Sequence, residues 1–172
     1  MTSNDHKQLL GVYLNDHLAG AVAGSELANR LAGAERGADG ATLNRIADEI
    51  AEDRRALLEI MAALEVDARR YKVIGAWWLE KIARLKPNRR LFQRSPLSRL
   101  LELEALRLGV EGKALGWRTL RNLIENADVV VADRLDRARV TELIARADRQ
   151  ADELEDLRLR ATLAFLESGT KT

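Results

Sequence analysis

The two prolines of this 172-residue chain, Pro87 and Pro96, lie within ten residues of each other. Proline costs about 3 kcal/mol in a helix interior, because it lacks a backbone N–H and its ring clashes with the preceding turn. On both sides of the prolines the sequence reads almost without interruption as amphipathic helix. This placement therefore predicts two helical halves of similar size, joined by one irregular connection.

The composition is that of one soluble domain built from long helices. A chain of 172 residues can bury a core without disulfides, and 32% charged with only 4% aromatic residues is typical of long helices. The absence of cysteine excludes disulfides and thiol catalysis and fits a cytoplasmic location. The 28 basic and 27 acidic residues nearly balance. We expect neither a signal peptide nor a transmembrane segment, because no apolar run approaches the ~18 residues of a membrane span.

The first half predicts an antiparallel hairpin over about residues 5–66. A helix from about Asp5 to Glu35 should end at Gly33 and the 37–40 glycine run, and Thr42 should cap the second helix. The two apolar seams are Leu10, Leu14, His17, Ala21, Gly24, Ala28 and Leu31, and Leu43, Ile46, Ile50, Asp53, Leu57, Ile60 and Leu64. A short connection between two such helices makes an antiparallel pair.

The crossover over about residues 67–95 is expected to hold an extra short helix, from Ala68 to Leu85. Its buried side would consist of Val73, Ile74, Trp77, Trp78 and Ile82. The helix should end before Pro87, since the residue that precedes a proline avoids helical angles. A loop over residues 88–94 would follow.

The second half predicts another hairpin, over about residues 96–167. Ser95 and Pro96 suit the N-cap and first position of a helix that runs to about Asn126. The last helix should cover about residues 132–167, after a β-branched connection at 129–131. The sequence thus predicts a single all-α domain, an antiparallel four-helix bundle over residues 1–172.

Two long helical hairpins joined by a connecting segment resemble the ferritin-like superfamily. The resemblance implies a bundle with one long crossover, and a di-iron centre made of a Glu from the first and third helices and a Glu-x-x-His pair from the second and fourth. Here both histidines, His6 and His17, belong to the first helix, and the runs 52–55 and 155–158 carry Arg at the position of the metal-binding His. A guanidinium cannot bind a metal. We therefore expect an Arg–carboxylate cluster in place of the metals, and no cofactor.

Several polar residues interrupt the apolar seams and are candidates for a ligand site or a polar core. They are Asp16, His17, Asp53, Arg54 and Arg158. A buried charge must be paired, so we expect Asp53–Arg158 or Asp16–Arg54 pairs, which could fix helix register or hold a small polar ligand. His17 could line a cavity as a ligand or titrating group. A core histidine bonded to a neighbour is the simpler interpretation, since a metal needs three or four ligands.

Seven basic residues and no acidic residue occupy the stretch from Lys81 to Arg99. The surface candidates in and beside it are Lys86, Arg89, Arg90, Arg94, Trp77, Trp78 and Phe92. Basic residues interleaved with aromatic ones can bind phosphates and stack on bases, or can bind an anionic membrane surface. The alternative is a solvated loop that pairs with acids of the last helix, namely Glu153, Glu155 and Asp156.

No nucleophile elbow, phosphate-binding glycine loop or paired-histidine motif is present, which disfavours an enzyme. We expect a non-catalytic helical binding or assembly module with a protein partner or a second copy as partner. A leucine-rich face, Leu97, Leu101, Leu108 and Leu115, could form a second buried face or a dimer contact. The alternatives are a ferritin-like metalloprotein with a site of Asp16, His17, Glu49, Glu52 and Asp53, and nucleic-acid or anionic-surface binding through Lys81–Arg99.

Overall fold

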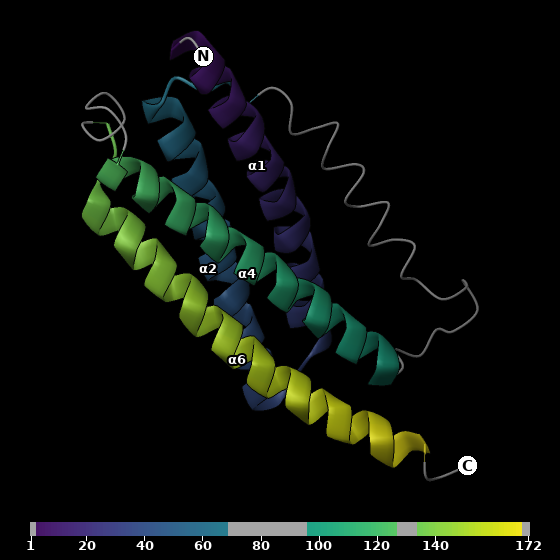
Figure 1. Cartoon of the computed structure of the whole chain (residues 1–172). Helices are drawn as coiled ribbons and strands as arrows, with labels where there is room; N and C mark the ends of the chain where they lie inside the picture. The colour runs from purple at the N-terminus through teal and green to yellow at the C-terminus, as the bar shows by residue number, and fades with distance from the viewer. Residues whose placement is uncertain (1–2, 69–95, 127–133, 170–172) are drawn as a thin grey trace.

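In the computed structural model, residues 3–68, 96–126 and 134–169 are described, and their regular elements are all α-helices (Figure 1). The four helices are α1 (Ser3–Ala34), α2 (Gly37–Ala63), α4 (Pro96–Asn126) and α6 (Arg137–Gly169). The all-α prediction with four long helices is confirmed. The extra short helix, the 88–94 loop and the 129–131 connection lie outside the described residues.

Each helix runs antiparallel to the two helices that it contacts. Tyr13, near the start of α1, donates a 3.0 Å hydrogen bond to Thr119 near the end of α4. At the other end of this pair of helices, Arg99 near the start of α4 contacts Glu35, directly after α1, at 3.1 Å, and Asp39 at 2.8 Å. Asp39, near the start of α2, also pairs at 3.1 Å with Arg160 near the end of α6. The helices therefore form two hairpins, α1–α2 and α4–α6, packed against each other through α1–α4 and α2–α6.

The two hairpins are connected from opposite ends of the bundle. Asn15 donates a 3.0 Å hydrogen bond to the carbonyl oxygen of Asp67, which places the end of the first hairpin beside the first half of α1. Arg99, just after the start of α4, lies beside Glu35 at the far end of α1. Residues 68 and 96 therefore lie toward opposite ends of the bundle.

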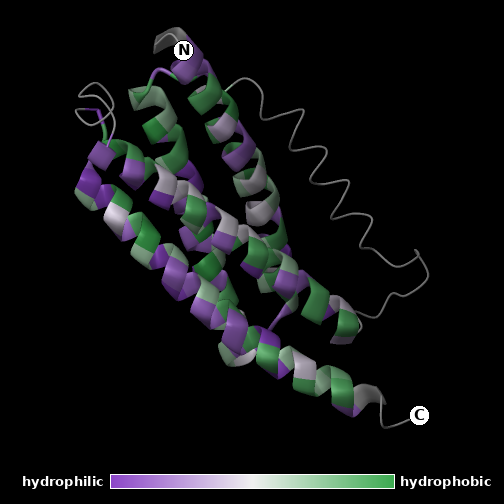
Figure 2. Cartoon of the chain, viewed as in Figure 1, coloured by the Kyte–Doolittle hydropathy of each residue, from purple (hydrophilic) through white to green (hydrophobic). Residues whose placement is uncertain are grey.

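Apolar side chains from all four helices form one core, and Figure 2 shows the hydrophobic and hydrophilic residues alternating around each helix. Fully buried members include Leu18, Leu43, Ile46, Leu103, Leu106, Leu143, Leu154 and Leu157. The predicted seam of α1 is buried at Leu14, Ala28 and Leu31 but only half-buried at His17 and at two small residues that follow it. That part of α1 faces a cavity rather than the core. No described helix is long and apolar enough to cross a membrane.

Two predicted helix starts are wrong. The 37–40 run, expected to be loop, forms the first turn of α2, because Gly37 adopts a φ of +67° and lets the chain reverse at once after Arg36. Thr42 is therefore inside α2 and not its cap. The last helix begins at Arg137 instead of residue 132, since the Asp136 side chain accepts a 2.8 Å hydrogen bond from the backbone N–H of Ala138.

A Schellman turn ends α2 close to residue 66, where the first hairpin is predicted to end. The Val66 N–H donates to the carbonyl of Met61, and the Glu65 N–H donates to that of Ala62. Glu65 occupies the left-handed position of this turn, with a φ of 55°. The turn satisfies carbonyls that the helix end would otherwise leave unpaired.

Candidate functional site

A buried carboxylate at the centre of the bundle joins three helices. Asp53 of α2 is 1% exposed, and its two oxygens face two cations. Lys113 Nζ of α4 lies 2.5 Å from Oδ2, and Arg146 Nη2 of α6 lies 2.6 Å from Oδ1. A buried charge is tolerated only when it is paired in this way.

The network around Asp53 extends through Gln150, which is completely buried on α6. Its side-chain oxygen accepts a hydrogen bond from Lys113, and its amide nitrogen donates a 2.8 Å hydrogen bond to Glu49. Arg146 also reaches Glu52, at 2.8 Å on the more exposed side of α2. The interior members, two carboxylates and two cations, therefore balance in charge.

Burial and pairing act against each other on the ionisable groups of this cluster. Burial lowers the pKa of the Lys113 ammonium, and the Asp53 carboxylate acts in the opposite direction without cancelling the effect. For Glu49, burial would raise the pKa, but the hydrogen bonds from Gln150 and Arg45 outweigh it and hold the pKa below its ordinary value. Pairing therefore offsets the effect of burial on the pKa in part for Lys113 and fully for Glu49.

The cluster does not fit the metal centre that the ferritin-like resemblance implies. Within the described residues no three histidine, aspartate or glutamate side chains converge as metal ligands. Each carboxylate of the cluster contacts a cationic or amide donor, and a metal ion would be repelled by Lys113 and Arg146. The atypical metal site expected from Asp16, His17, Glu49, Glu52 and Asp53 is therefore not assembled in this part of the chain.

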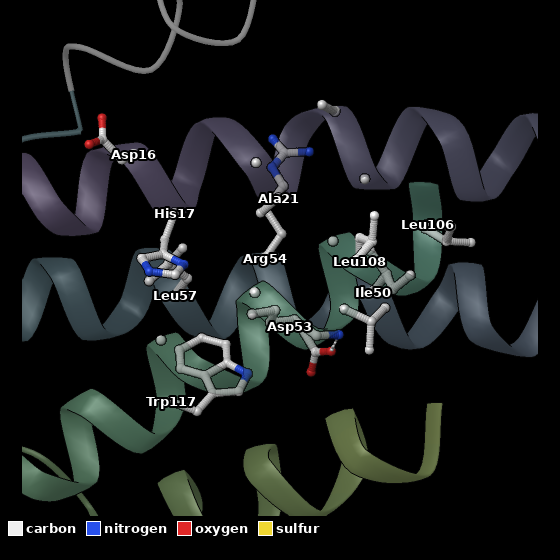
Figure 3. Close-up of a pocket in the computed structure, with 18 of the residues that line it drawn as sticks. Asp16, His17, Ala21, Ile50, Asp53, Arg54, Leu57, Leu106, Leu108 and Trp117 are labelled. Atoms are coloured by element: carbon white, nitrogen blue, oxygen red, sulfur yellow. Dashed lines mark hydrogen bonds and ion pairs between the residues drawn. The ribbon is translucent and has the colours of Figure 1, made fainter. Parts of the chain in front are cut away.

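Beside the cluster, α1, α2 and α4 line a partly open cavity of about 610 Å³ (Figure 3). Its wall is mainly apolar and includes Leu14, Leu27, Ile50, Leu57, Leu106 and Leu120. Asp53 and Lys113 form one part of the wall, so the cavity and the charge cluster share a boundary. Ligand pockets typically have volumes of about 300–1,000 Å³ and a predominantly apolar lining.

Small residues on two facing helices explain why this space is open. Gly20 and Gly24 of α1, and Gly109 and Gly112 of α4, all line the cavity. A Cβ atom added at any of these four glycines would meet no atom within 4 Å. Among the described residues, no side chain fills the space beside these four glycines.

His17 projects from α1 into the cavity, as Figure 3 shows. Its ring packs edge-on against Tyr13, with the ring centroids 4.6 Å apart. It also lies against Gly116 of α4, where an added Cβ would come within 2.9 Å of the imidazole. Burial lowers the pKa of His17, and the nearby Asp16 carboxylate opposes the shift only in part. No hydrogen bond to the imidazole is found among the described residues, which favours the cavity interpretation over a bonded core histidine.

The predicted ion pairs are wrong in their partners. Lys113 and Arg146 take the place expected for Arg158, which pairs instead with Glu155 of its own helix at 2.7 Å. Arg158 lies twelve residues beyond Arg146, or about 18 Å along a helix, so it cannot reach Asp53.

The other predicted pair is also missing from the described part of the chain. Asp16 and Arg54 both line the cavity, but their side chains are exposed and no ion pair joins them. These two residues therefore form the rim of the cavity instead of a core pair. Arg54 points away from the cluster because it follows Asp53 directly, and adjacent helix positions differ by about 100°.

Sequence reasoning missed three members of the cluster, Lys113, Arg146 and Gln150. Each lies three or four residues from buried positions on its helix, for example Gln150 between Ala147 and Leu154. A polar residue in step with an apolar seam is the signal that could have identified them.

Of the basic stretch, Arg99 alone lies within the described residues, where it contacts Glu35 at 3.1 Å and Asp39 at 2.8 Å. The surface candidates Lys86, Arg89, Arg90, Arg94, Trp77, Trp78 and Phe92 lie outside them. Of the acids expected to pair with this stretch, Glu153 pairs with Arg45, and Glu155 pairs with Arg107 and Arg158.

Comparison of the chain with protein-family models, curated proteins and solved structures found no match. The functional conclusions therefore rest on the geometry of the cavity and of the charge cluster.

Replacing Asp53 by Asn should lower the free energy of unfolding by about 3–5 kcal/mol, because two buried cations lose their carboxylate. Denaturant unfolding followed by circular dichroism measures this change. Asp48→Asn, at an exposed position of the same helix, is the matched control and should change stability by less than about 0.5 kcal/mol. Adding Lys113→Met to Asp53→Asn should restore part of the loss. If Asp53→Asn were as stable as the control Asp48→Asn, the structural role of the cluster would be contradicted.

Acidification from pH 7.5 to 5.5 should destabilise the protein in part through His17. The unfolded chain binds a proton at this residue near pH 6.5, whereas the folded protein binds it only at lower pH. The free energy of unfolding therefore decreases as the pH is lowered through this window. Denaturant unfolding at the two pH values should show a smaller loss for His17→Gln than for the wild type. His6→Gln, on the exposed start of α1, is the control and should behave as the wild type.

Proposed function

We propose that this protein is a non-catalytic helical binding module of ferritin-like layout, in which the cavity between α1, α2 and α4 is the binding site. The observation that carries this proposal is the cavity itself, about 610 Å³ in volume and lined mainly by apolar side chains. Helical bundles hold ligands in such spaces between facing helices.

The ferritin-like part of the proposal is supported by the order of the helices. Two antiparallel hairpins joined from opposite ends of the bundle require one long crossover, which is the connectivity of ferritin-like bundles. The Asp53 cluster lies at the centre of this bundle, and we propose that Lys113 and Arg146 supply there the positive charge that metal ions supply in ferritin-like proteins with a metal centre. A cytoplasmic location remains part of the proposal, supported by the absence of cysteine.

Binding without catalysis is supported by the residues that line the cavity. No serine, threonine or cysteine is among those that the structure describes, so the wall offers no hydroxyl or thiol nucleophile of the usual kind. The carboxylate of Asp53 and the ammonium of Lys113 neutralise each other, and the Tyr13 hydroxyl is engaged with Thr119. The imidazole of His17 has the chemistry of a general base, but the described wall offers no serine, threonine or cysteine for it to activate.

The cavity should bind N-phenyl-1-naphthylamine, a neutral apolar dye whose fluorescence rises in apolar surroundings. Gly112→Leu should weaken binding at least tenfold, because the new side chain would occupy the space where no atom lies within 4 Å of the added Cβ. Gly33→Leu is the matched control, since Gly33 has equally open surroundings but does not line the cavity. Absence of dye binding, or equal binding by both variants, would contradict the proposed site.

A second candidate function, self-association, is favoured by a row of exposed leucines on α4. Leu97, Leu101, Leu108 and Leu115 follow one another at steps of four and seven residues, and Leu108 and Leu115 are 64% and 60% exposed. Apolar residues gathered on one exposed helix face are typical of interaction surfaces.

Sedimentation equilibrium should show a concentration-dependent dimer if the leucine row is an interface. Leu115→Glu should then yield a monomer with unchanged helix content, because a charge cannot be buried there without a partner. Leu163→Glu, at an equally exposed position of α6, should leave the dimer intact. A wild-type protein that stays monomeric at high concentration would rule this candidate out.

A further inference from the structure

The polar groups in the cavity wall restrict the chemistry of a ligand. Tyr13 donates its hydroxyl hydrogen to Thr119, and Lys113 is bound to Asp53 and Gln150, so these groups are already engaged. Asp16 and Arg54 are exposed at the rim and carry opposite charges. The imidazole of His17 is left as a polar group of the wall without a hydrogen bond in the described part of the chain.

The nitrogens of His17 are open to the cavity. His17 has no hydrogen bond within the described structure, yet neither of its nitrogens is among the fully buried polar atoms that lack one. Its nitrogens therefore keep accessible surface. The indole nitrogen of Trp117, by contrast, is fully buried and lacks a hydrogen bond within the described ranges. Trp117 is 3% exposed and lines the same cavity, so its indole N–H is a second donor without a partner among the described residues.

The charge state of the wall favours a neutral ligand. The interior carboxylates and cations balance, and no excess charge remains to compensate an ionised group that leaves water. Because burial lowers its pKa, His17 is a neutral imidazole at neutral pH, with one nitrogen that donates and one that accepts.

The position of His17 is fixed before any ligand binds. Gly116 lies so close to the imidazole that even a methyl group there would collide with it, and Tyr13 packs against the ring from its own helix. A side chain held in this way loses little conformational freedom when it forms a new hydrogen bond.

We propose that the cavity takes a neutral, largely apolar molecule with one carbonyl or hydroxyl oxygen, and that His17 is the residue that hydrogen-bonds this oxygen. This inference rests on the proposed binding function of the cavity. It assigns the apolar body of the ligand to the leucine and glycine wall, and the oxygen to the side that His17 occupies.

The test compares three probes of similar shape: 2-ethylnaphthalene without a polar atom, 2-acetylnaphthalene with a carbonyl, and 2-naphthoate with a charge. Each displaces N-phenyl-1-naphthylamine from the protein at pH 7.5, followed by fluorescence. The ketone should bind about fivefold more tightly than the hydrocarbon, as one net hydrogen bond provides, and naphthoate should bind most weakly.

Two variants assign the preference to His17. His17→Phe keeps an aromatic ring beside Gly116 and should abolish the advantage of the ketone over the hydrocarbon. His17→Gln, which retains a donor and an acceptor, should keep part of the advantage. Circular dichroism confirms that each variant is folded; if neither variant folds, the order of the three probes on the wild type decides.

The outcomes separate this inference from the function on which it rests. Equal affinities for the hydrocarbon and the ketone, or a ketone advantage that survives in folded His17→Phe, would overturn the role of His17 while the cavity remains a binding site. Tightest binding of naphthoate would overturn the neutral ligand class. Absence of binding by the dye and by all three probes would overturn both proposals.

Discussion

The contact of Asp53 with Lys113 and Arg146 is the constraint on which the rest of the bundle depends. A carboxylate buried to 1% exposure needs its cations in place, and these come from two other helices. Satisfying one charge therefore fixes the axial position of α2, α4 and α6 relative to one another. Gln150 and Glu49 complete the network, because Gln150 bonds both Lys113 and Glu49 and so links α6 to α4 and α2.

The first helix is held differently, and the cavity follows from that difference. α1 contributes no member to the charge cluster; it packs through leucines and faces α4 with glycines where a bulky residue could have stood. The cluster closes one side of the bundle and leaves the α1–α4 side open. The interior is thus polar where α2, α4 and α6 meet in the charge cluster, and apolar and open where α1 faces α4.

Much of the fold could be predicted from the sequence because apolar periodicity determines which face of a helix is buried. The positions of Leu14, Leu43 and Leu103 follow from it directly. The start of α2 was mispredicted because a glycine run usually ends a helix, whereas Gly37 with a positive φ reverses the chain and starts the next one.

The site could be predicted only in part. Asp53 and His17 stand out because each interrupts an apolar seam, but the partners of Asp53 depend on how far each helix slides along its neighbours. That shift is set by side-chain packing between helices distant in sequence, which the pattern within one helix does not contain. For the same reason the cavity, which arises where glycines of two helices meet, is visible only in the structure.

The ion pairs of Glu65 at one end of the bundle have a consequence for its use as a structural unit. Lys7 near the start of α1 and Arg134 just before α6 both contact Glu65, so α1 and α6 begin at the same end of the bundle and run in the same direction. Ser3 and Gly169 consequently lie at opposite ends, as Figure 1 shows. Since a helix of 32 residues spans about 48 Å, the bundle acts as a strut that would keep anything attached to its two ends well apart.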